Sequence, residues 1–185
     1  MLRNGKKIQT GIFKQPAKGP IEVKRLGLEG DQQANKKLHG GAYKAICVYP
    51  SEHYDLWKEE LGNPDLFFGD FGENLTTAGL VEGDIYLGDR LRIGSAEVVV
   101  TQPREPCITL NARLNTKDLS ARIRKSGRSG FYFLVEREGT IKTGDSIEYM
   151  SRDKNRVSVS DFNQIINGEP EVAGIIFRAS KIETL

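Results

Sequence analysis

Short runs of β-branched and aromatic residues, separated by polar turns, dominate the hydropathy pattern of this chain. Glycine followed by aspartate, as at Gly30, Gly69 and Gly144, supplies many of the turns. Many short strands at close and roughly even spacing are typical of an antiparallel β-barrel or sandwich. The segments expected as strands are residues 45–49, 84–88, 90–94, 97–102, 131–136 and 145–150.

Two internal segments carry the helical spacing of apolar residues together with signals for their ends. Ser51 is the expected N-cap of a helix over residues 52–61, which Gly62 closes. A second helix is expected to start at Thr116 and to stop at Gly127. Helices are therefore the minor component of a mainly β protein.

The chain changes character near residues 152–156. Ser158 is the expected N-cap of a third helix, with Val157 and Phe162 as its hydrophobic staple. The sequence therefore predicts a mainly β domain over residues 1–156, either a barrel or a sandwich, and a short helical tail over residues 157–185.

Composition fits one soluble domain of ordinary size, with 185 residues, 38% hydrophobic and 28% charged. The formal net charge is +2, so no overall field exists to hold a nucleic-acid backbone. No window approaches about 18 uninterrupted apolar residues, the signal of a membrane span. We therefore expect a cytoplasmic protein that binds neither nucleic acid nor a membrane.

The two cysteines, Cys47 and Cys107, exclude several kinds of site. They are too few for an iron-sulfur cluster, and with two histidines they do not form a closed zinc site. Cys47 lies in the apolar run AICVY, where a thiol acts as a small hydrophobe. Cys107 follows QPREP, where prolines interrupt strand pairing and Arg104 favours the thiolate form. Cys107 is therefore the candidate for reactivity or metal binding.

Four segments, in this order and spacing, resemble the MOSC domain, and the likeness is closest to the bacterial subfamily that protects cells from 6-hydroxylaminopurine. The resemblance implies a β-barrel that binds the molybdenum cofactor, molybdopterin, through one cysteine and reduces N-hydroxylated bases. By this resemblance Cys107 is the molybdenum ligand. The four segments are GLEGDQQANKKLHGG (27–41), FGENLTTAGL (71–80), GDRLRIGSAEVVVTQPREPCITL (88–110) and GRSGFYFLVEREGTIKTGDSIE (127–148).

The chemistry of such a centre agrees with a single protein ligand. Molybdopterin supplies two dithiolene sulfurs of its own, and a soft thiolate suits the metal. Reduction of Mo(VI) to Mo(IV) and back matches cleavage of an N–O bond, in which R-NHOH becomes R-NH2 and water. The chain has no flavin or dinucleotide motif. It therefore needs a separate electron-donor protein of flavoprotein or ferredoxin type.

The resemblance also implies residues that bind the cofactor. Arg104 is expected at the phosphate or an oxo ligand, Asn74 at the pterin edge, and Arg128 of GRSG at an anion. Each has a plainer alternative: a solvated loop arginine, a turn-stabilising asparagine, and a helix-ending turn.

The two histidines, His39 and His53, are expected to have different roles. His39, in LHGG with Gly40 and Gly41, lies beside the pterin or substrate in this interpretation, where it passes a proton to the leaving hydroxyl. The alternative is a glycine turn with a hydrogen-bonded structural histidine. His53, at the start of a capped helix, is interpreted as structural.

Two other functions stay open. In one, Cys107 holds cofactor or sulfur for delivery to another enzyme. In the other, Cys107 is the nucleophile of a hydrolase with His39 as its base. Members of the similar subfamily usually carry a longer three-helix tail, whereas 29 residues follow Arg156 here.

Overall fold

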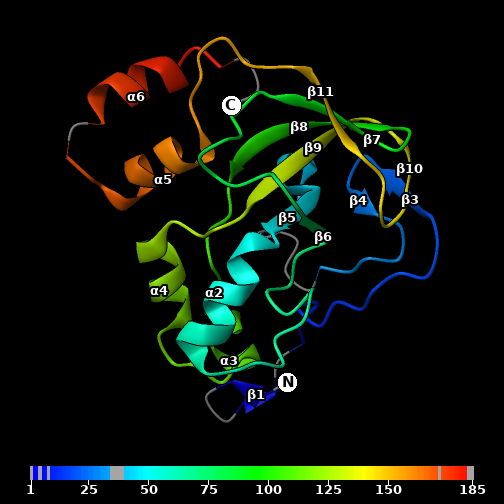
Figure 1. Ribbon diagram of the computed structural model, residues 1–185, viewed down its shortest axis with the longest axis vertical. Coiled ribbons are helices and arrows are strands. Elements are labelled where there is room, and N and C mark those ends of the chain that lie inside the picture. The colour runs from blue at the N-terminus through cyan, green and yellow to red at the C-terminus, as the bar shows by residue number, and fades with distance from the viewer. Residues whose placement is uncertain (1, 4–5, 8, 34–39, 171, 183–185) are drawn as a thin grey trace.

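A six-stranded sheet, curled into a half-barrel, forms the centre of the computed structural model (Figure 1). The structure describes all residues except 1, 4–5, 8, 34–39, 171 and 183–185. β5 and β6 are parallel, and the other neighbours in this sheet are antiparallel. The strand order is β11 (Ile147–Ser151), β7 (Arg90–Ile93), β8 (Ala96–Pro103), β9 (Phe131–Arg137), β5 (Ile46–Pro50) and β6 (Leu75–Thr77).

Two smaller sheets complete the β structure. The first is three-stranded, with β3 (Ile21–Lys24) between β10 (Gly139–Ile141) and β4 (Gly27–Leu28). The second pairs β1 (Leu2–Arg3) with β2 (Lys6–Lys7) near the N-terminus. The expectation of a mainly β fold with a few short helices is confirmed.

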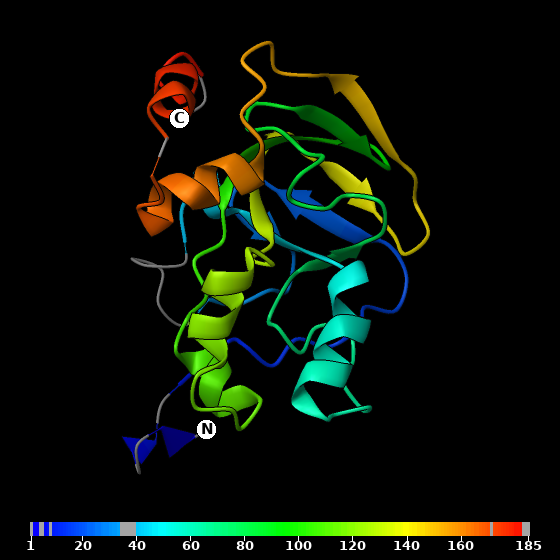
Figure 2. The same ribbon diagram turned by 60° about the vertical axis from the view of Figure 1, so that its left-hand side comes forward.

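Helices cover two regions of the half-barrel. α2 (Glu52–Leu61), α3 (Thr109–Arg113) and α4 (Leu119–Ser126) gather at its lower end (Figures 1 and 2). α5 (Val159–Asn167) and α6 (Ala173–Ala179) form the tail beside its upper part, and a 3-10 turn, η1 (Ala42–Lys44), precedes β5.

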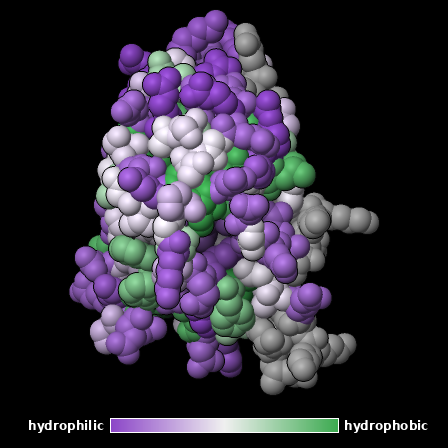
Figure 3. Space-filling view, turned by 90° about the vertical axis from the view of Figure 1, so that its right-hand side faces the viewer, coloured by the Kyte–Doolittle hydropathy of each residue, from purple (hydrophilic) through white to green (hydrophobic). Residues whose placement is uncertain are grey.

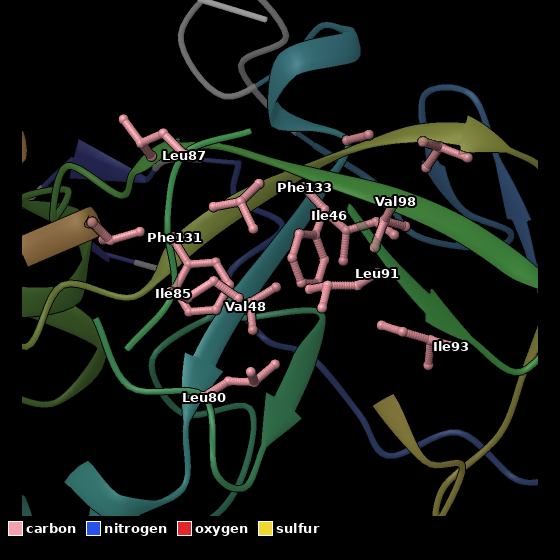
Figure 4. Packing of buried hydrophobic residues seen from close by; sticks show 14 of the residues in the cluster. Ile46, Val48, Leu80, Ile85, Leu87, Leu91, Ile93, Val98, Phe131 and Phe133 are labelled. Carbon is pink, nitrogen blue, oxygen red and sulfur yellow. The ribbon is translucent and has the colours of Figure 1, made fainter. Parts of the chain in front are cut away.

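Alternation along β5 separates two cores, because successive strand side chains point to opposite faces. Ile46 and Val48 point into the half-barrel, where they pack with Phe131 and Phe133 of β9 (Figure 4). Tyr49 points to the other face and packs in a second cluster with α2, α3 and α4. Burial of each large side chain contributes roughly 1.5–3 kcal/mol, so this alternation fixes the face on which each residue of β5 lies.

The expected strand over residues 84–88 is wrong. This segment is a turn with one isolated bridge, between Tyr86 and Ser158. The backbone N–H of Tyr86 donates to Asp89 Oδ2, and the N–H of Asp89 donates to the Tyr86 carbonyl. Local side-chain bonding of this kind competes with strand pairing.

The helix ends are partly as expected. Gly62 and Gly127 close α2 and α4 in the left-handed conformation. Ser158 caps α5, with reciprocal bonds to Asp161. Ser51 is the N-cap of α2 as expected, but its side chain makes no cap bond. The expected start of the second helix is wrong, because α4 begins at Leu119, three residues after Thr116.

Candidate functional site

Cys107 lies in an irregular loop between the end of β8 and the start of α3. Its side chain is partly exposed, beside the exposed Glu105 and Ile108. The thiol donates to Thr109 Oγ1 at 3.2 Å, and the backbone N–H of Thr109 donates to the sulfur, with N and Sγ 3.4 Å apart. The thiol is therefore held by the first residue of α3 and remains within reach of solvent.

Arg104 is buried beneath this loop rather than exposed on it, with 7% of its surface accessible. Its Nη2 donates to the Phe71 carbonyl at 2.5 Å, and its backbone N–H donates to the Gly130 carbonyl at 3.0 Å. Burial lowers the pKa of the guanidinium, but attraction to Cys47 and Tyr132 among other groups offsets this, and the net direction is upward. Arg104 is thus a fixed positive charge inside the protein.

Cys47 lies on β5 opposite Tyr132 of β9, on the face that Arg104 approaches. Only 8% of Cys47 is exposed. Burial raises the pKa of its thiol, and the positive charge of Arg104 opposes this in part. Its environment is that of a packed thiol, in contrast to the partly exposed Cys107.

The Asn74 amide has both of its ends occupied by protein groups. Its Oδ1 accepts from the Cys47 backbone N–H at 2.9 Å, and its Nδ2 donates to Asp31 Oδ2 at 2.9 Å. Asp31 also pairs with Lys14. Asn74 therefore connects β5 to Asp31, and its expected contact with the pterin edge stays a prediction. The sequence analysis did not identify Lys14 or Asp31 in this network, although Asp31 lies in the LEGD turn.

Arg128 is held on helix α2. Its Nη1 donates to Glu60 Oε2 at 3.1 Å, and its guanidinium lies 5.2 Å from the ring centre of Trp57. The Arg128 carbonyl accepts from the Tyr49 hydroxyl at 3.1 Å. The Arg128 side chain therefore contacts the Glu60 carboxylate and the Trp57 ring, both on α2.

His39, the expected proton carrier, lies outside the described residues. Gly40 is partly buried, and Gly41 has a φ of 99° and begins the turn η1. This turn sits against the strands that carry the site, because Thr101 Oγ1 of β8 donates to the Tyr43 carbonyl at 2.7 Å. Thr101 thus holds the turn that follows the glycine pair against β8.

His53 is buried, and its Nε2 lies 2.7 Å from Glu82 Oε2. The other oxygen, Glu82 Oε1, accepts from the Gly130 backbone N–H at 2.7 Å. The sequence analysis did not single out Glu82, because nothing local in VEGD signals a partner 48 residues away.

A cavity of about 1170 Å³ opens on the face that carries β3, β4 and β10. Figure 3 shows this face, where apolar residues lie between polar ones. Residues of the N-terminal segment, of β6 and of the 141–149 segment line it, and Cys107 does not. Lys14, Asp31 and Asn74 stand on its wall.

Among the described residues, no group of three or more His, Cys, Asp or Glu side chains lies close enough together to hold a metal ion. Within the same part of the chain, no helix has both the length and the apolar character to span a membrane.

The chain matches the MOSC domain family over residues 35–148. The chain is 45% identical over 162 residues to YflK of Bacillus subtilis (strain 168), covering 88% of this chain and 73% of YflK. It is 40% identical over 145 residues to YiiM of Escherichia coli (strain K12), covering 77% of this chain and 65% of YiiM. A protein named "Reductase" from Gibberella moniliformis (strain M3125 / FGSC 7600) is 33% identical over 165 residues, covering 88% of this chain and 29% of that protein.

Solved structures give the same fold. The crystal structure of YiiM from Geobacillus stearothermophilus aligns with a TM-score of 0.83 at 36% identity, covering 95% of this chain and 83% of that one. YiiM from Escherichia coli aligns with a TM-score of 0.79 at 31% identity, covering 91% of this chain and 80% of that one.

Proposed function

Because the chain belongs to the MOSC domain family, we propose that it is a reductase of N-hydroxylated compounds that binds the molybdenum cofactor through Cys107. Membership confirms the resemblance inferred from the sequence and the MOSC-type barrel. MOSC domains are associated in general with this cofactor, and one relative is named a reductase. The observation that carries the proposal is a partly exposed thiol on the loop after β8, within a MOSC domain.

The residues around Cys107 fit such a group in part. A partly exposed thiol can bind a soft metal, and the buried Arg104, three residues earlier in the chain, holds the start of its loop through the Phe71 and Gly130 carbonyls. Asn74 and Arg128 use part of their hydrogen-bonding capacity on protein partners, and their contacts with the pterin edge and with an anion stay predictions. The cofactor, when bound, supplies the two-electron chemistry that reduces R-NHOH to R-NH2 and water.

The remaining tasks belong to the chain. Cys107 binds the metal, while Thr109 holds the thiol at the start of α3. Arg104 fixes the loop to Phe71 and to Gly130, which keeps the thiol in one place. In the proposal the proton for the leaving hydroxyl comes through His39, and electrons come from a separate donor protein.

The test is metal content followed by turnover. Protein made in cells that synthesise molybdopterin should hold molybdenum near one equivalent, Cys107→Ser should lose most of it, and Cys47→Ser should retain it. With an artificial low-potential electron donor, the loaded protein should convert 6-hydroxylaminopurine to adenine, whereas NADH alone should not support turnover. Equal metal loss in both cysteine variants would exclude Cys107 as the ligand. Molybdenum without turnover would instead identify a carrier.

A further inference from the structure

The backbone of Gly130, through its N–H on one side of Cα and its carbonyl on the other, connects the Cys107 loop to the rest of the protein. Its carbonyl accepts from the Arg104 backbone N–H at 3.0 Å, three residues before Cys107. Its own N–H donates to Glu82 Oε1 at 2.7 Å. Gly130 has a φ of 71°, and a Cβ on it would lie 2.4 Å from the Val48 carbonyl oxygen. The position of the Gly130 backbone therefore fixes the position of Arg104, the first residue of the loop after β8.

Glu82 is a buried carboxylate with both oxygens occupied, and 4% of its surface is accessible. Its Oε2 lies 2.7 Å from His53 Nε2 on α2, and the His53 ring packs edge-on against Tyr49 at 5.5 Å. The Glu82 backbone carbonyl also accepts from the Ser160 N–H at 2.9 Å, at the start of α5. A buried carboxylate in this setting is stable only while its partners remain, because removal of one leaves an uncompensated charge.

We propose that Glu82, oriented by His53, is a positioning residue for the loop that carries Cys107. The connection runs from His53 through Glu82 to the Gly130 N–H, and from the Gly130 carbonyl to the Arg104 N–H. The hydrogen bond from Gly130 to Glu82 has a charged acceptor, which makes it stronger than an ordinary backbone bond. The functional importance of this role rests on the proposed function, but the geometry does not depend on a bound cofactor.

The bond between Gly130 and Glu82 also shows which group the GRSG loop, residues 127–130, binds. The backbone N–H of Gly130 would suit an external anion, as the GRSG motif suggested. In the folded chain Glu82 supplies that negative group from within the protein. The loop thus serves to hold Arg104 and Cys107.

Two substitutions of Glu82 distinguish a role in positioning the Cys107 loop from a role in filling space in the core. Glu82→Gln keeps an oxygen for the Gly130 N–H and an amide that can hydrogen-bond with His53. Glu82→Ala removes both. In cofactor-free full-length protein, hydrogen exchange at the Arg104 amide should become about tenfold faster in Glu82→Ala, the effect of losing a bond to a charged group. Glu82→Gln should restore most of the protection.

A reference within each sample removes the effect of overall stability. The Val100 amide, within β8, donates to the Asp89 carbonyl and should change only with global unfolding. The matched control is Ser158→Ala, which removes another buried side chain that accepts a backbone N–H, that of Asp161. It should leave the ratio of Arg104 to Val100 exchange unchanged.

The outcomes are distinct. An unchanged exchange ratio in Glu82→Ala, or a Gln variant as fast as Ala, would overturn the inference. If Glu82→Ala does not fold, His53→Ala replaces it, and an equal change at Arg104 and Val100 would then overturn the inference. The reaction rate of the Cys107 thiol with a disulfide reagent is a second readout, with buried Cys47 as reference. If these effects appear in a chain that never binds molybdenum, the positioning role stands and the proposed function fails.

Discussion

At the residue scale, the contrast between the two cysteines could be read from the sequence, but the partners of the polar residues could not. An apolar run predicts burial for Cys47, and prolines predict a loop for Cys107; the structure places both accordingly. Asn74 lies 43 residues from Asp31, and Glu82 lies 48 residues from Gly130. Such pairs depend on sheet order, which no local pattern specifies.

Arg104 gives the first prediction. Arg104→Ala removes a buried guanidinium and leaves the Phe71 carbonyl without this donor, so the free energy of unfolding should fall by roughly 1–3 kcal/mol in cofactor-free protein. Arg104→Lys should recover only part, because lysine lacks the planar fork. Denaturant unfolding measures both.

The control for Arg104 is Arg137→Ala, since Arg137 is an exposed strand residue paired with Glu97. It should change stability by less than about 0.5 kcal/mol. An Arg104→Ala variant as stable as this control would show that the buried guanidinium contributes nothing to the loop.

Asp89 gives a prediction about pH. Burial raises the pKa of its carboxyl above the ordinary value, so the folded protein binds this proton more tightly than the unfolded chain does. Stability from this group is therefore present at low pH and is lost as pH rises from about 4 through the raised folded value. Asp89→Asn should remove that part of the slope, which urea unfolding between about pH 3.5 and pH 7 would measure. A parallel pH dependence in the two proteins would contradict this.

At the element scale, turn and cap residues specify where elements end, while sheet neighbours decide which apolar runs become strands. Ser158 and Gly62 were predictable because their bonds are local. The strands β6 and β10, three residues each, carry too short a pattern to be distinguished from loop. The 84–88 segment had a strand pattern, but it became a turn because Asp89 bonds the Tyr86 N–H.

Two glycines that follow α4 provide a matched pair. Gly127 and Gly130 both have a φ of 71°, but a Cβ on Gly127 meets nothing within 4 Å. Gly127→Ala should therefore cost about 1–2 kcal/mol, for the left-handed conformation alone. Gly130→Ala should cost clearly more, because its Cβ would collide with the Val48 carbonyl oxygen. Thermal unfolding compares them, and equal losses would show that the backbone there relaxes without cost.

At the scale of the whole molecule, the tail and the half-barrel share one core. The predicted division into residues 1–156 and 157–185 stays a prediction, and Val157, Val159, Ala179 and Ile182 of the tail belong to the cluster inside the half-barrel. The Leu87 N–H also donates to the Val157 carbonyl at 2.9 Å.

A chain that ends at Arg156 should therefore lose its fixed tertiary packing, because the apolar surface beneath the tail becomes exposed. Near-ultraviolet circular dichroism and urea unfolding would measure the loss. The control is Phe177→Ala in the full chain, a residue of α6 that is 63% exposed, which should have little effect. A native-like spectrum from the shortened chain would establish that the half-barrel folds alone.

The parallel pairing of β5 and β6 also bears on the order of folding. β7 and β8 are joined by a two-residue turn, since Ile93 lies opposite Ala96, and they can meet as soon as that turn forms. β6 can pair with β5 only after residues 51–74, including the whole of α2, have closed a loop. The entropy of that closure is lost before any ladder bond is gained. The hairpin therefore forms early in refolding, before β6 pairs with β5, and the pairing of β5 with β9, which encloses residues 49–130, has a still longer loop to close.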